Sequence, residues 1–105
     1  MGIMGKSTDY KTMGKILEAQ SKTLENQAKV AKKTMDMMQA QAEERRVAYE
    51  EALASGNEAM IELYKKQYEE ALLAAQEAQD NYLSSAEEWA ESLKSILENK
   101  LSDLG

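Results

Sequence analysis

The chain has 105 residues, which is a usual length for one domain, and its formal net charge is −6. It contains no histidine, cysteine or proline, so disulfide bonds, thiolate chemistry, zinc sites built on histidine and Ser-His-Asp catalysis are excluded. Charged residues make up 30 % and aromatic residues only 6 % of the chain, a composition typical of long helices and coiled coils.

Residues 1–8 are predicted to form a flexible N-terminal tail, and residues 9–105 a single helical-hairpin domain. Ser7, Thr8 or Asp9 can cap the first helix, and Gly14 is its one weak point. Gly5 and the three residues after it resemble the end of a phosphate-binding loop. Because the upstream glycine and the preceding strand of that motif are missing, we expect no nucleotide site.

Each arm of the chain carries a stripe of residues at alternating spacings of three and four, the heptad pattern of coiled coils. The two stripes meet row by row when the chain is folded at Gly56. They predict an all-α fold, a long antiparallel helical hairpin with arms at about 9–54 and 58–103. The hairpin seam, meaning the facing residues of the two arms, is expected to contain Leu17, Leu24, Ala31, Met35, Met38, Tyr49, Ile61, Tyr68, Tyr82, Trp89 and Ile96.

One column of each stripe is bulky and the other is small. The small columns consist of Gly14, Ser21, Ala28 and Ala42 in the first arm, and of Ala71, Ala78, Ser85 and Ser92 in the second. Small side chains let two helix backbones approach closely, while large ones on the other column fill the rows. This pattern predicts tight packing between the arms.

The turn is expected at Ser55, Gly56 and Asn57. Glycine suits the left-handed conformation that ends a helix, and asparagine can cap the helix that follows. Asp80 and Asn81 are poor helix formers, so a kink or short break near residues 80–85 is one alternative for the second arm. The heptad pattern passes through this region without a change of phase, which favours a single helix.

The seam contains two features with more than one interpretation. Arg45 falls opposite Tyr68, where its guanidinium can lie on the ring or simply extend to water. Met35 and Met38 fit the seam, and together with Met37 they could instead form an adaptable contact surface.

Charge is distributed unevenly along the chain. Residues 1–46 hold nine basic and six acidic side chains, whereas residues 47–105 hold four and thirteen. One heptad column of the first arm changes sign, and it consists of Lys15, Lys22, Lys29, Asp36, Glu43 and Glu50. Because its acidic half would repel phosphate, we expect no nucleic-acid binding, and we interpret the column either as a solvated face or as a surface that orders subunits.

The end of the second arm has an apolar face beside the seam, formed by Ala90, Leu93, Leu97, Leu101 and Leu104 together with Ala86. A two-helix hairpin cannot cover both faces. The leading interpretation is contact with a partner helix or another copy. The alternatives are cover by Ile3 and Met4 of the N-terminal tail, or binding to a membrane surface.

The size and hairpin plan resemble those of small exported proteins of the type VII secretion class. Their Trp-x-Gly turn is replaced here by Ser55-Gly56-Asn57, and no tyrosine has an acidic residue four positions on. Asn57, Tyr64 and the stretch 78–81 resemble the start of the second helix in needle subunits of type III secretion systems, which are hairpins that polymerise. The proline-containing turn of those subunits is missing, and neither resemblance assigns the chain to a family.

We therefore expect a non-enzymatic structural protein that packs into a homo-oligomeric bundle, a filament or a larger complex such as a secretion apparatus or a virion. The alternative is a small acidic adaptor, chaperone or inhibitor that binds one protein partner through the C-terminal leucines. We expect no cofactor, metal or small-molecule substrate. No apolar run approaches the ~18 residues of a membrane span and no signal peptide is evident, so cytoplasmic, signal-free exported and virion locations all stay open.

Overall fold

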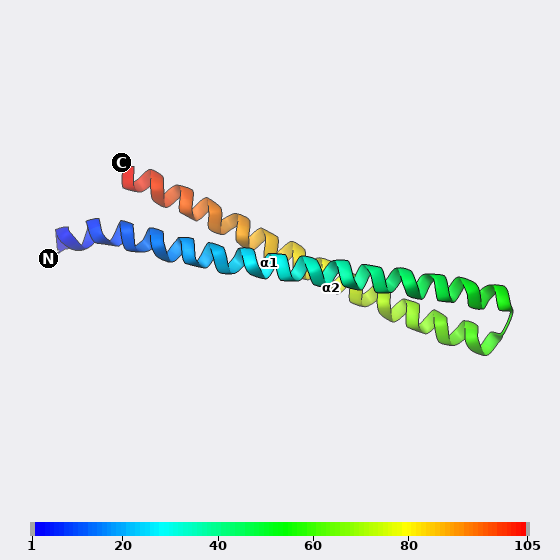
Figure 1. Ribbon diagram of the computed structural model, residues 1–105. Helices are drawn as coiled ribbons and strands as arrows, with labels where there is room; N and C mark the ends of the chain where they lie inside the picture. Colours follow the sequence, from blue (N-terminus) through cyan, green and yellow to red (C-terminus); the bar gives the residue numbers. More distant parts are fainter. Residues whose placement is uncertain (1, 105) are drawn as a thin grey trace. The chain divides into compact units, whose positions relative to one another are not determined.

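The computed structural model describes the backbone of residues 2–104 and the side chains from Tyr10 to Leu104. The backbone forms two helices, α1 (Gly2–Ser55) and α2 (Glu58–Leu104), joined by Gly56 and Asn57 (Figure 1). No strand occurs among these residues. The predicted all-α antiparallel hairpin is confirmed.

Three of the four helix ends agree with the sequence prediction to within about one residue. The exception is the start of α1, which lies at Gly2, seven residues before its predicted position. Residues 2–8, which we expected to form a flexible tail, are therefore helical in the structure. Each glycine in this stretch costs a helix only about 1 kcal/mol relative to alanine, and no proline interrupts the backbone hydrogen bonds. The alternative in which Ile3 and Met4 cover the C-terminal leucines lies outside the described side chains.

α2 continues through residues 80–85 as one helix, so the alternative of a break at Asp80 and Asn81 is not realised. A few residues of low helix propensity cost less than about 1 kcal/mol each, and the packing of a long amphipathic face outweighs that cost.

The turn satisfies the backbone groups left open by both helix ends. Gly56 has a φ of +73°, the left-handed region that favours glycine, and its N–H donates to the carbonyl of Leu53 at 3.3 Å. The side-chain oxygen of Asn57 accepts hydrogen bonds from the backbone N–H groups of Ala59 and Met60, at 3.1 and 3.3 Å. Asn57 is thus the N-terminal cap of α2, a position that asparagine side chains favour.

The chain divides into two compact units, and each contains antiparallel segments of both helices. The turn unit is Val30–Tyr82, with the end of α1, the turn and the start of α2. The terminal unit combines the residues up to Lys29 with those from Leu83 onward. Each unit has its own part of the seam.

The core of each unit is made of small side chains. The buried residues are Ser21 and Ala28 in the terminal unit, and Ala42, Ala52, Ala75 and Ala78 in the turn unit. Among the described residues no large side chain is fully buried. The helices therefore pack backbone to backbone, and the bulky residues of the stripes lie at the margins of the contact.

Candidate interaction surface

In the turn unit, the seam is held by aromatic and polar contacts between the helices. The rings of Tyr49 and Tyr68 are stacked, with centroids 6.1 Å apart and planes 29° from parallel. Arg45 Nη1 donates to Gln67 Oε1 at 3.0 Å, in a partly buried position. The guanidinium of Arg45, for which the ring of Tyr68 and water were the two alternatives, is thus engaged by Gln67, while Tyr68 packs on Tyr49. A partly buried hydrogen bond across a seam fixes the pairing of the helices, because a shifted register leaves both groups unpaired.

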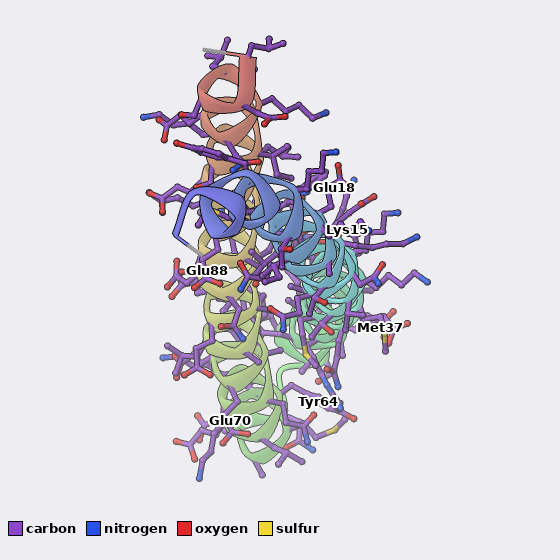
Figure 2. All side chains as sticks on the ribbon, turned by 90° about the vertical axis from the view of Figure 1, so that its left-hand side faces the viewer. Lys15, Glu18, Met37, Tyr64, Glu70 and Glu88 are labelled. Carbon is purple, nitrogen blue, oxygen red and sulfur yellow. The ribbon has the colours of Figure 1, made fainter. Side chains whose placement is uncertain are left out.

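The remaining predicted seam residues of the turn unit are half-buried, and they are Ala31, Met35, Met38, Ile61 and Tyr82. Met37, between the two seam methionines, is 68 % exposed and projects outward (Figure 2). The three methionines therefore do not form one contact surface.

In the terminal unit, a glycine of α1 faces α2. A Cβ added to Gly14 would lie 3.2 Å from Oδ1 of Asn99 on α2. The two residues are almost equally far from Gly56 along the chain, which is the register that the paired stripes require. Leu17, Leu24, Trp89 and Ile96 are half-buried in the same seam, and Ser92 Oγ donates to the carbonyl of Trp89 at 2.6 Å.

The charge column is exposed along its whole length, and ion pairs within α1 occupy part of it. The six residues Lys15, Lys22, Lys29, Asp36, Glu43 and Glu50 are all exposed. Lys29 Nζ lies 3.0 Å from Glu25 Oε1, one helical turn earlier. In Figure 2, Lys15 and Glu18 project from the same side of α1, opposite to the side on which Glu88 of α2 lies.

Arg46 engages both acidic residues of the column that lie within one turn of it. Its Nε donates to Glu43 Oε2 at 3.0 Å, its Nη2 pairs with Glu43 Oε1, and its Nη1 lies 2.5 Å from Glu50 Oε1. The hydrogen bond from Arg46 lowers the pKa of the Glu43 carboxyl, and the two carboxylates raise the pKa of Arg46. The acidic half of the column is thus partly neutralised within its own helix, so less of its charge remains to attract another subunit.

The C-terminal leucines form the most continuous apolar surface of the described residues. Leu93, Leu97, Leu101 and Leu104 are 47, 58, 59 and 85 % exposed, and Ala90 beside them is also exposed. Their spacing places them along one side of α2, next to the seam residues Trp89 and Ile96. Nothing in the described part of the chain covers them.

The structure extends this surface toward the turn by one residue, Leu83, beyond the predicted Ala86. Leu83 is 54 % exposed and Ala86 is half-buried, and both continue the same helical spacing. We define the leucine stripe as Leu83, Ala86, Ala90, Leu93, Leu97, Leu101 and Leu104. Sequence reasoning did not include Leu83, although its position seven residues before Ala90 was a sufficient signal.

The stripe is confined to the terminal unit. The heptad column that contains Leu83, Ala90, Leu97 and Leu104 holds Glu62, Glu69 and Gln76 in the turn unit. The column changes from polar to apolar at Leu83, which is the first residue of α2 in the terminal unit. The exposed leucines therefore belong to one segment and do not reflect the general composition of α2.

An open hollow of about 360 Å³ beside Arg45 is lined by Gln41, Arg45, Gln67, Glu70, Ala71 and Ala74. Glu70 carries the one carboxylate among these lining residues, and none of the others is a side chain that commonly acts as a general acid or base. Among the described residues, no three acidic side chains gather closely enough to hold a metal ion, and neither helix contains a segment long and apolar enough to cross a membrane.

Comparisons with protein-family models, with curated proteins and with solved structures find no match to this chain.

Proposed function

We propose that this protein is a non-enzymatic assembly subunit, a helical hairpin that packs with further copies of itself into a homo-oligomeric bundle, a filament or a larger complex. The observation that carries this proposal is the leucine stripe, because its five leucines (Leu83, Leu93, Leu97, Leu101 and Leu104) are about half exposed or more. Burying a leucine side chain fully is worth about 1.5–3 kcal/mol, so covering this surface is strongly favourable.

The weakly filled core supports the same conclusion. The buried residues of both units are alanines and one serine, so the seam alone buries little apolar surface. Trp89, Ile96, Leu17 and Leu24 of the terminal unit remain half-exposed at the margins of the seam. Further helices packed on the stripe would also cover Trp89 and Ile96, because these two residues lie next to it on α2.

Light scattering across a concentration series tests the proposal. The wild-type chain is expected to form a defined oligomer or filament, whereas Leu97→Asp with Leu101→Asp is expected to remain helical but monomeric. The matched control is Leu63→Asp with Leu73→Asp, because those leucines lie on α2 of the turn unit and are 53 and 61 % exposed. If the control variant dissociates and the stripe variant does not, the stripe is not the assembly surface.

A second candidate function uses the same surface for a different partner. In this case the chain is a small acidic adaptor, chaperone or inhibitor that holds one protein through the stripe, as a helix bound in a groove. The observation that favours it is the excess of acid in the same segment, with five acidic residues and two lysines over residues 83–104. A chain that stays monomeric at all concentrations, and whose partner binding is lost in the stripe variant, would support this function over self-assembly.

A further inference from the structure

We infer that the leucine stripe is occupied by the same stripe of a second copy, antiparallel to it, around a twofold axis between Leu93 and Lys94. This inference rests on the proposed self-assembly and goes beyond it, because it names the partner segment, its direction and its register. Three properties of the stripe support it, namely its order of residue sizes, its charges and its area.

The positions of the stripe residues are nearly the same when the segment is read backwards, and their sizes are then complementary. Inverting the segment about the point between Leu93 and Lys94 places Leu83 level with Leu104 of a second copy, Ala86 level with Leu101, and Ala90 level with Leu97. Each alanine thus meets a leucine, so small and large side chains interdigitate across the pair. In a parallel pair, Ala90 would meet Ala90 and leave a gap, while Leu97 would meet Leu97.

The charges that border the stripe favour the same direction and register. Glu87 lies four residues after Leu83, and Lys100 lies four residues before Leu104, so both flank the stripe. Within the described residues neither takes part in an ion pair. Antiparallel pairing sets Glu87 level with Lys100 of the second copy, and the twofold axis repeats this pair. Parallel pairing would set glutamate against glutamate and lysine against lysine.

The exposed area of the stripe is sufficient for a weak, specific dimer. The exposed fractions of its five leucines correspond to an area on the order of 500 Å² per copy, or about 1,000 Å² for two copies. A specific interface needs about this area, while an exposed patch of this size is at the upper end for a monomer. The association is therefore expected to depend on concentration.

The other described surfaces are less suited to binding a second copy of the chain. Val30 and Met37 of the turn unit share one side of α1, but their column continues as Glu44, and Leu63 of α2 is followed seven residues later by Glu70. A head-to-tail contact between the stripe and the corresponding column of the turn unit would bury Glu62 and Glu69 against leucine, which leaves charges without partners. Pairing of the stripe with itself avoids this cost.

Disulfide cross-linking of the full chain tests the inference, because the protein has no cysteine and each variant then carries a single thiol. Leu93→Cys lies beside the axis and is expected to cross-link with its own copy. Leu104→Cys is not expected to cross-link with its own copy. In the proposed pair the two residues 104 are about 31 Å apart along the helix axes, whereas a disulfide needs Cα atoms within about 7 Å. A mixture of Leu83→Cys and Leu104→Cys is expected to give the mixed disulfide, identified by mass spectrometry.

A charge exchange provides a second readout on chains without engineered thiols. Glu87→Lys is expected to weaken association about threefold to tenfold at low salt, because it creates two like-charge pairs. Adding Lys100→Glu is expected to restore the affinity to within about twofold of the wild-type value. Restoration of the affinity requires that residue 87 of one copy faces residue 100 of the other. If Glu87 only stabilised its own helix, a change at residue 100 would not restore the affinity.

The outcomes separate this inference from the proposed function. If the wild-type chain is monomeric at all concentrations, the proposed self-assembly is wrong and the inference with it. If the chain assembles but Leu104→Cys cross-links with its own copy, or the mixed disulfide is missing, the antiparallel pairing is wrong and self-assembly stands. The expected cross-links together with restoration by the double charge exchange establish the pairing.

Discussion

Replacing Gly14 with alanine is expected to stabilise the protein, although Gly14 sits where the two helices of the terminal unit approach closely. Alanine is better than glycine inside a helix by about 0.5–1 kcal/mol. The new methyl group would lie 3.2 Å from Oδ1 of Asn99, so this atom must move by a few tenths of an ångström. Asn99 is only half-buried, and its terminal amide rotates easily, so the move costs little. The net gain of about 0.5–1 kcal/mol corresponds to a rise of roughly 2–6 °C in Tm.

Thermal unfolding followed by circular dichroism, at one fixed protein concentration, measures this change. The informative companion is Gly14→Leu, because leucine and alanine have similar helix propensity but differ in size. A leucine facing α2 must push the helices apart or leave its preferred rotamer, so Gly14→Leu is expected to be about 1–3 kcal/mol less stable than Gly14→Ala. Equal stability of the two variants would show that Gly14 does not face α2, and the register described above would be refuted.

Three further predictions concern the seam, the turn and the ion pairs of α1. Ala42→Leu is expected to lower the free energy of unfolding by about 1–3 kcal/mol, because Ala42 is 6 % exposed, whereas Ala40→Leu on the exposed side should change it by less than about 0.5 kcal/mol in urea titrations. Gly56→Ala is expected to cost about 1 kcal/mol in the same assay, since its φ of +73° strains any residue with a Cβ even though nothing lies within 4 Å. Arg46→Gln is expected to raise the pKa of Glu43 toward the ordinary glutamate value in an NMR titration. The pKa of Glu43 is lowered in the folded chain, so its pairing with Arg46 stabilises the helix at neutral pH and is lost as the pH falls through that pKa.

The fold could be predicted because it follows from local rules that act along the whole chain. The heptad spacing determines which side of each helix is apolar, and Gly56 with Asn57 provides both the left-handed residue and the cap that a reversal needs. The start of α1 could not be located from such signals. Residues 7–9 have side chains that cap helices well, but they also tolerate a helix interior at small cost, and nothing before them stops the helix.

Contacts at the seam were less predictable than the seam itself. The sequence places Arg45 level with Tyr68, but it does not determine which neighbour a flexible side chain chooses. In the structure Tyr68 stacks on Tyr49, which leaves Arg45 to donate to Gln67. These alternatives differ by only about 1 kcal/mol, well below the packing energy that determines the hairpin.

Unlike the seam, the leucine stripe has no partner among the described side chains, and the reason is geometric. Successive residues on a helix point about 100° apart. Ala90, Leu93 and Leu97 of the stripe each follow a seam residue by one position, so they point to the side and not toward α1. One turn at Gly56 brings only one neighbouring helix to α2, and that helix occupies the seam side. A second apolar side therefore needs cover from outside the described seam, which the proposed assembly provides. The charges on its two flanks, Glu87 near one end and Lys100 near the other, are arranged so that a reversed copy of the same segment meets them with opposite sign.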